Sequence, residues 1–236
     1  MPLSYLRHCC WSLDAMSAGD VQSLLAAARS LKRGGPHDGL HGCHAALLCE
    51  APGPSAELFA AACRGLGATV AHVSPSLSRL GEQPHAAEVA RLLGRLYAAI
   101  GCDGLAPWLM QALARDAGVP VFNPVAGATH PTRLVATLLT MAEEGGRDAA
   151  ETRLCVAAGA PPALLAAWRR CAELTGLELH GGAPAHGDFL LEAPRQPSRP
   201  PRLARVDGLG RPRLLAAQES ANHGLVVQAL LAHTVG

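Results

Sequence analysis

The stretch Val119-Pro-Val-Phe-Asn-Pro-Val-Ala-Gly-Ala-Thr-His-Pro-Thr-Arg-Leu-Val-Ala-Thr-Leu-Leu-Thr140 decides how this chain folds. It opens with a short apolar run that is typical of a buried strand. A turn that carries His130, Pro131 and Thr132 follows, and the remaining residues have the apolar spacing of an amphipathic helix. A strand that leads through a turn into a helix is the repeating unit of an α/β fold.

Segments of the same two kinds alternate on both sides of this stretch. Their patterns predict helices over residues 20–33, 58–66, 85–100, 108–117, 162–175 and 218–232, and strands over residues 45–49, 68–73, 119–122, 153–157 and 177–180. Residues 194–212 are rich in Pro, Arg and Gly, so they are expected to be irregular. This alternation favours parallel, doubly wound sheets.

Composition sets limits on the class of protein. A chain of 236 residues with 49% hydrophobic and 17% charged residues is expected to be globular, with one large or two small domains. A formal charge of +1 and 3% aromatic residues give no reason to expect nucleic acid or a membrane as a partner. No apolar run approaches the ~20 residues that span a bilayer, and residues 1–10 lack signal-peptide features, so a cytoplasmic location is expected. The eight scattered cysteines favour reduced thiols.

The opening stretch resembles the signature of the aspartate/ornithine carbamoyltransferases, in which a Val-Pro-Val-Ile-Asn strand precedes His-Pro-Thr-Gln or His-Pro-Cys-Gln and a Leu-rich helix. Residues 25–32 are similar to the family's first helix, and residues 80–100 to its Leu-Gly and Asp-Thr-Ala-Arg-Val-Leu-Ser-Arg-Met-Tyr-Asp-Ala-Ile segments. The run Glu219-Ser-Ala-Asn222-His223 resembles the closing Glu-x-x-Asn-Arg helix. The resemblance is dense over the first 145 residues and patchy after them.

The resemblance implies an α/β fold with two doubly wound parallel-sheet domains of carbamoyltransferase type, the second reduced. Residues 1–145 correspond to the carbamoyl-phosphate-binding domain and residues 146–217 to a shortened amino-acid-binding domain. The final helix, residues 218–236, is expected to pack back on the first domain. Family members associate through that first domain, and residues 76–81 match a segment that reaches toward a neighbour's active site. A homo-oligomer, most simply a trimer, is therefore expected.

The resemblance also identifies where phosphate contacts are missing. The family holds carbamoyl phosphate in a Pro-Ser-Thr-Arg-Thr-Arg loop that opens a helix, where backbone N–H groups and arginines converge on one phosphate. The corresponding residues 50–59 contain no arginine, and Glu57 stands where basic groups belong. Asp103 and His223 stand at two further arginine positions. Ser55 remains as a candidate for substrate binding.

Other candidate site residues lie at the strand-to-helix turn and near the end of the chain. His130 corresponds to the group that polarises the carbamoyl carbonyl, although it could equally be satisfied locally and shape the turn. Thr132 and Asn222 are further binding candidates. Arg133 stands where the family has Gln, and it could either contact an anion or be solvated as an exposed first-turn residue.

The amino-acid half of the family's site is hard to find in this sequence. Gly187-Asp188 is the only candidate remnant of the Asp-x-Trp-x-Ser-Met-Gly loop, and the His-Cys-Leu-Pro loop has no counterpart. His41, Cys43 and His44 lack a fourth ligand at zinc-finger spacing, so no metal or cofactor is expected. Neither a dinucleotide fingerprint nor a Gly-x-Ser-x-Gly elbow occurs.

Three interpretations of function remain open. The chain could be a carbamoyltransferase-like protein that has lost catalysis and keeps a binding or assembly role, with a small anionic or amino-acid ligand or a full-length carbamoyltransferase as partner. It could be an active transferase that uses His130 and Arg133 on an altered substrate. It could also be a decaying gene product with little function.

Overall fold

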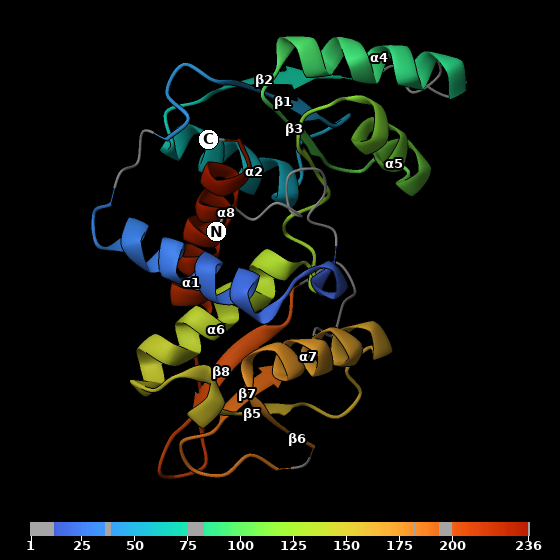
Figure 1. Ribbon diagram of the computed structural model, residues 1–236. Helices are drawn as coiled ribbons and strands as arrows, with labels where there is room; N and C mark the ends of the chain where they lie inside the picture. The colour runs from blue at the N-terminus through green and yellow to red at the C-terminus, as the bar shows by residue number, and fades with distance from the viewer. Residues whose placement is uncertain (1–11, 36–38, 75–82, 182, 194–199, 236) are drawn as a thin grey trace. The chain divides into compact units, whose positions relative to one another are not determined.

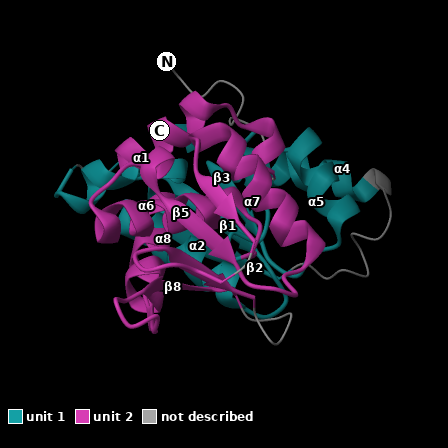
Figure 2. Ribbon diagram, turned by 90° about the horizontal axis from the view of Figure 1, so that it is seen from below, with its two compact units in different colours: residues 1–11, 28–126, 227–236 teal, residues 12–27, 127–226 magenta. Residues whose placement is uncertain are grey.

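The computed structural model describes residues 12–35, 39–74, 83–181, 183–193 and 200–235 (Figure 1). Two compact units share these residues, as Figure 2 shows. Of the described residues, the first unit contains 28–35, 39–74, 83–126 and 227–235, and the second contains 12–27, 127–181, 183–193 and 200–226. The domain boundary expected after residue 145 stays a prediction. The segment 76–81 and Gly182 lie outside the described residues.

A parallel four-stranded sheet forms the centre of the first unit, with the strand order β2-β1-β3-β4. Its strands are β1 (His44–Leu48), β2 (Thr69–Val73), β3 (Ala99–Cys102) and β4 (Val121–Phe122). The helices that follow them are α2 (Pro54–Gly65), α4 (Gln83–Leu96) and α5 (Pro107–Asp116). Every residue of β3 is buried, as expected for a parallel strand covered on both faces.

The side chains of β3 show that helices cover both faces of this sheet. Ile100 and Cys102 belong to a buried cluster that includes Leu109 and Leu113 of α5. Gly101 points to the other face, where a Cβ atom would lie 2.6 Å from the ring of Phe59 on α2. Helices on both sides of a parallel sheet define the doubly wound arrangement, so the expected α/β fold is confirmed.

The single helix expected over residues 85–100 is wrong. Helix α4 ends at Leu96, and the next residues turn into β3. The backbone N–H of Ala98 donates to the carbonyl oxygen of His44, and that of Ile100 donates to Pro120. Helical spacing continues through Ala98 and Ala99 in the sequence, but pairing with two neighbouring strands overrides this local preference.

Close packing of α4 against the end of α5 depends on Gly94. A Cβ atom at this position would overlap the carbonyl oxygen of Ala117. Backbone atoms cannot move aside as a flexible side chain can, so only glycine is accommodated here. The contact fixes α4 beside α5 on one face of the first sheet.

A mixed five-stranded sheet, in the order β6-β5-β7-β8-β9, forms the centre of the second unit. Its strands are β5 (Arg153–Val156), β6 (Glu178–His180), β7 (Phe189–Glu192), β8 (Arg202–Val206) and β9 (Pro212–Leu214). Strands β6, β5 and β7 are parallel, whereas β8 and β9 run antiparallel to their neighbours. Helices α6 (Pro131–Gly145) and α7 (Pro162–Thr175) belong to this unit, and α1 (Ala18–Lys32) and α8 (Ala216–Val235) each contribute residues to both.

The sequence prediction that residues 194–212 are irregular is also wrong in its second half. Leu203, Ala204 and Val206 of β8 are buried, and a tight turn leads into β9. The carboxylate of Asp207 holds this turn by accepting hydrogen bonds from the backbone N–H groups of Leu209 and Arg211. The Pro-, Gly- and Arg-rich composition obscured a short hairpin, and the hairpin makes the second sheet mixed instead of fully parallel.

No helix in the described ranges is long and apolar enough to cross a bilayer.

Candidate functional site

The first turn of α2 is hydrogen-bonded to the carboxylate of Asp103, which lies in another segment of the first unit. Gly53 is the N-cap residue and offers no side chain, and Pro54 follows it. The first N–H groups of a helix have no partner within the helix. The N–H of Ala56 donates to Oδ2 of Asp103 at 3.0 Å. Asp103 follows β3 and is held there because its own N–H donates to the carbonyl oxygen of Leu48.

The backbone around this carboxylate is closely fitted. A Cβ atom on Gly53 would lie 2.8 Å from Oδ2 of Asp103, so a larger residue would require the carboxylate to shift. Ser55 is buried, and its hydroxyl oxygen accepts a hydrogen bond of 3.1 Å from the N–H of Ala126. Glu57 lies in the same first turn and is exposed. Asp103 therefore supplies the helix cap that the local sequence lacks.

Two cysteines lie beside Asp103 at the carboxyl ends of the central strands. Burial raises the pKa of the Cys102 thiol to about 12, and the charge of Asp103 adds to the effect. Burial and the same charge also raise the pKa of Cys49, whose sulfur lies 3.1 Å from Nε2 of His72. Because both thiols remain protonated near neutral pH, neither is suited to act as a thiolate nucleophile.

His130 caps helix α6 in the second unit. Its Nδ1 atom accepts a hydrogen bond of 3.2 Å from the N–H of Thr132 and lies 2.7 Å from the Thr132 hydroxyl. The same hydroxyl is 3.0 Å from Nε2 of His223 on α8. All three residues are buried. The hydroxyl of Thr132 therefore joins the two imidazoles in one network that connects α6 with α8.

A buried ion pair starts from the next residue in the first turn of α6. Arg133 Nη1 is 3.7 Å from Oε1 of Glu219, which also accepts a hydrogen bond of 2.9 Å from the Thr137 hydroxyl. Burial raises the pKa of Glu219, and the Thr137 hydrogen bond and the Arg133 charge oppose this rise. Burial lowers the pKa of Arg133, which the charge of Glu219 opposes. Arg133 is thus an internal cation and not a solvated one.

Asn222 completes the contacts between these helices. Its Nδ2 atom donates to the Thr140 hydroxyl at 3.0 Å and to Oε2 of Glu143 at 2.9 Å. Glu143 also accepts a hydrogen bond from Gln218. Asn222 therefore links two polar side chains of α6 to α8.

The predicted site residues form two groups. Ser55, Glu57 and Asp103 lie in the first unit, and His130, Thr132, Arg133, Asn222 and His223 lie together in the second. Sequence reasoning did not select Glu219, Thr137 or Thr140 as site residues. The sequence does carry a signal for them, because polar residues recur at helical spacing within otherwise apolar helices. Such a pattern indicates that the polar residues lie on one face of the helix.

The remaining candidates have local structural roles. Asp188 lies at the start of β7, where its carboxylate accepts hydrogen bonds from the N–H of Ala185 and the thiol of Cys155. The side chain of His44 is hydrogen-bonded to Thr69 in the neighbouring strand. Across the part of the chain that the structure describes, no three His, Cys, Asp or Glu side chains are placed to hold a metal ion.

Comparisons with known proteins identify the family that this chain resembles. The family model "Aspartate/ornithine carbamoyltransferase, carbamoyl-P binding domain" matches residues 7–143. A catabolic ornithine carbamoyltransferase of Pseudomonas putida is 34% identical over 141 residues, which cover 58% of this chain and 42% of that protein. An ornithine carbamoyltransferase of Neisseria meningitidis is 40% identical over 94 residues, 40% of this chain and 36% of that protein. The chain thus matches less than half the length of either relative.

The structural comparison extends over nearly the whole chain. The crystal structure of ornithine carbamoyltransferase from Thermus thermophilus superposes with a TM-score of 0.74 at 19% identity and covers 97% of this chain and 99% of that one. The carbamoyltransferase-type fold that the sequence resemblance implied is therefore confirmed.

Proposed function

Because the chain belongs to the aspartate/ornithine carbamoyltransferase family, we propose that it has lost carbamoyl transfer and retains a binding or assembly role. The observation that carries the proposal is the hydrogen bond from the N–H of Ala56 to the carboxylate of Asp103. A helix N-terminus is a binding site for an anion, because its first N–H groups and the helix dipole favour negative charge. Here the anion is supplied by the protein.

The loss of the arginines should weaken phosphate binding by a large factor. A phosphate dianion at the first turn of α2 would meet the negative charge of Asp103 without the arginines that neutralise it in the family. Hydrogen bonds to charged groups contribute roughly 1.5 to 3 kcal/mol each. Losing three such groups removes on the order of 5 to 9 kcal/mol, which corresponds to about 10³- to 10⁶-fold in affinity.

The environment of His130 supports the same proposal. Its Nδ1 atom already serves as the acceptor for the first turn of α6, and its ring is buried beside Thr132. His223 stands at the position of a third family arginine, and it is hydrogen-bonded to Thr132. We therefore assign His130, Thr132 and His223 to the joining of α6 and α8.

One observation favours the alternative of an active transferase with an altered substrate. The Nε atom of Arg133 is buried and has no hydrogen-bond partner among the described residues. A substrate oxyanion could use this donor if α6 and α8 separated locally. The pairing of Arg133 with Glu219 makes such an opening costly, so we rank this function second.

The test of lost transfer is an assay for citrulline formed from ornithine and carbamoyl phosphate. We expect no product above background from this protein, with an active ornithine carbamoyltransferase as the positive control. Aspartate is tested in parallel as the acceptor amine. Product from either amine, abolished by His130→Gln, would establish the active alternative.

The assembly role is proposed as a homotrimer or as an association with a full-length carbamoyltransferase. The support is the match of the family model to the first part of the chain, through which family members associate. An accessory role predicts that the protein co-elutes with a full-length carbamoyltransferase from the same source. Independent elution of the two proteins at micromolar concentration excludes it.

A further inference from the structure

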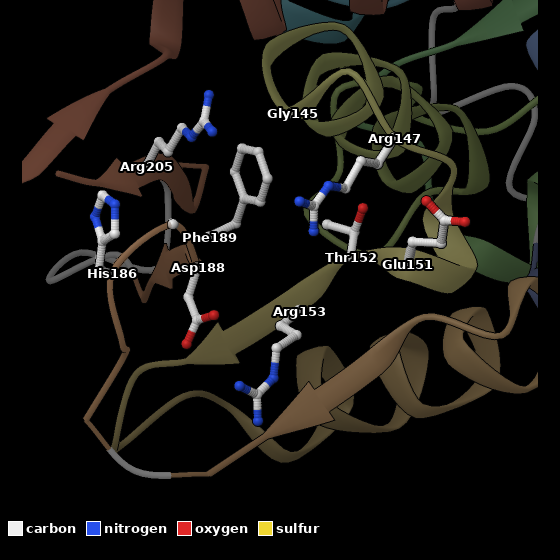
Figure 3. Close-up of a pocket in the computed structure, with 10 residues that line it drawn as sticks. Gly145, Arg147, Glu151, Thr152, Arg153, His186, Asp188, Phe189 and Arg205 are labelled. Carbon is white, nitrogen blue, oxygen red and sulfur yellow. The ribbon is translucent and has the colours of Figure 1, made fainter. Parts of the chain in front are cut away.

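A cavity of about 370 Å³ opens at one edge of the five-stranded sheet (Figure 3). Its walls come from the loop after α6, from the starts of β5 and β7, and from β8. The side chains that matter for its chemistry are those of Arg147, Glu151, Arg153, Asp188, Phe189 and Arg205. Its volume is within the range of about 300 to 1,000 Å³ that is usual for small-molecule sites.

The cavity lies at the other end of α6 from His130, Thr132 and Arg133. His130 precedes the first residue of α6, whereas Gly145, the last residue of that helix, borders the cavity. A helix of 15 residues is about 22 Å long. Strands β5 and β7 also begin here, whereas ligands of α/β sheets usually bind where parallel strands end. The cavity is therefore a second location with its own chemistry.

Most charged groups in the wall already have partners. Arg153 pairs with Glu178 at 3.2 Å, and Figure 3 shows its side chain directed away from the others. The carboxylate of Asp188 accepts hydrogen bonds from Ala185 and Cys155. Arg205 donates to the carbonyl oxygen of Glu144. These contacts position the wall, in which the carboxylates of Asp188 and Glu151 have no ion-pair partner among the described residues.

Arg147 differs from the other arginines. It is exposed, and it has no hydrogen bond or ion pair within the described ranges of the chain. Figure 3 shows its guanidinium reaching toward the middle of the group, while the carboxylate of Glu151 is turned to the other side. The cavity therefore presents a guanidinium whose donors are available to a ligand.

Phe189 and Arg205 complete the arrangement. The guanidinium carbon of Arg205 lies 5.8 Å from the centre of the Phe189 ring, close enough for a cation–π contact. This contact and the hydrogen bond to Glu144 fix the orientation of Arg205. In Figure 3 the Phe189 ring lies between Arg205 and Arg147. The ring gives an apolar surface between two cations.

We propose that this cavity binds a small molecule with two or more negative charges on carboxylate or phosphate groups, with Arg147 as the principal contact and Arg205 and Phe189 as its supporting wall. Planar guanidinium groups form paired hydrogen bonds with either oxyanion. This inference does not depend on the loss of carbamoyl transfer, because the cavity is at the opposite end of α6 from His130.

The test is calorimetric titration of the whole chain with citrate and, separately, with pyrophosphate at constant ionic strength. We expect saturable one-to-one binding of at least one probe. Binding of citrate alone identifies a carboxylate ligand, and binding of pyrophosphate alone identifies a phosphate ligand. Arg147→Ala weakens that binding about tenfold or more, since one charge-assisted contact is lost, and Arg147→Glu abolishes it.

The matched control is Arg169→Ala on α7. Arg169 is also exposed, and its loss changes the net charge by the same amount. It should leave the affinity unchanged, and both Arg147 variants should melt as the wild type does because Arg147 makes no hydrogen bond or ion pair with the described residues. Absence of binding by both probes, or an equal loss in the Arg147 and Arg169 variants, overturns the proposal.

Carbamoyl phosphate is itself a dianion, so a thermal shift separates this proposal from the previous one. Stabilisation by carbamoyl phosphate that disappears in Arg147→Glu belongs to the cavity. Stabilisation that persists in Arg147→Glu and disappears when Ser55 is changed to Ala contradicts the proposed loss of phosphate binding at α2, and leaves the citrate and pyrophosphate result unaffected.

Discussion

Arg133 on α6 and Glu219 on α8 form an ion pair that is almost entirely removed from solvent, with 13% and 3% of their side chains exposed. Taking two charges out of water is costly, and their attraction offsets that cost only while both are present. The pair therefore fixes the register of the two helices more than it adds to their stability.

Breaking this pair should be more harmful than replacing it. We expect Glu219→Gln to lower the free energy of unfolding by about 3 to 5 kcal/mol, because Arg133 remains buried without a counter-charge. The double variant Arg133→Met, Glu219→Leu should recover most of this loss. Urea denaturation measures both, with Ser220→Ala, exposed on the same helix, as the control. A double variant as unstable as Glu219→Gln contradicts the argument.

His130 is expected to contribute as a helix cap. His130→Ala removes the acceptor for the Thr132 N–H and should cost about 0.5 to 2 kcal/mol. His130→Asn provides another side chain that favours the cap position, so it should cost less. Thermal unfolding of the two variants makes the comparison. If Asn is no better than Ala, the imidazole acts through its other contacts and not as a cap.

Removing the carboxylate of Asp103 should expose the first turn of α2 to anions. We expect Asp103→Ala to melt at a lower temperature than the wild type, because the Ala56 N–H loses its acceptor. Millimolar inorganic phosphate should then raise the melting temperature of Asp103→Ala more than that of the wild type. Glu57→Ala, which removes an exposed charge from the same turn, is the control. An equal response of all three proteins would refute the assignment.

Alkaline pH should destabilise the fold through its buried thiols. The pKa of Cys102 is about 12 in the folded protein against an ordinary value of 9.0. Between these values the folded chain binds more protons than the unfolded chain, so stability falls as pH rises from about 9 toward 12. Each such thiol contributes up to about 1.4 kcal/mol per pH unit. Cys102→Ala should flatten the measured slope, whereas Ser220→Ala, which removes no thiol, should leave it unchanged.

The proposed trimer is tested by light scattering during size exclusion. One chain has a mass of 24.4 kDa, so the expected particle has three times that mass. Leu92 and Leu96, one turn apart on α4, are more than half exposed and give the first unit apolar surface that is available for association. A mass near that of one chain at micromolar concentration excludes the trimer.

The sequence predicted the fold where a local pattern and a buried environment agree. The run from Val119 to Thr140 became β4 and α6, because its apolar spacing matches the packing of both elements. Strand β3 was missed because four residues buried on both faces show no alternation, and alanines beside them suit a helix equally well. The β8–β9 hairpin was missed because its residues were judged by their Pro, Gly and Arg content, which is typical of irregular segments.

The site was harder to predict than the fold. The sequence placed His130 and Arg133 at the start of one predicted helix and Asn222 in another, but it could not show that Arg133 is buried with Glu219. The contact between Asp103 and Ala56 joins residues 47 positions apart, so no local pattern reports it. The cavity beside Arg147 combines a loop with three strands, and only the tertiary structure assembles such a surface.

The carboxylate of Asp103, which is part of the same chain, behaves as a tethered ligand at the start of α2. A tethered group competes at an effective concentration that is on the order of millimolar for short links. Free anions below that concentration cannot displace Asp103, so the start of α2 is insensitive to their level. A single change at position 103 would convert this helix end into one whose occupancy follows the concentration of free anion.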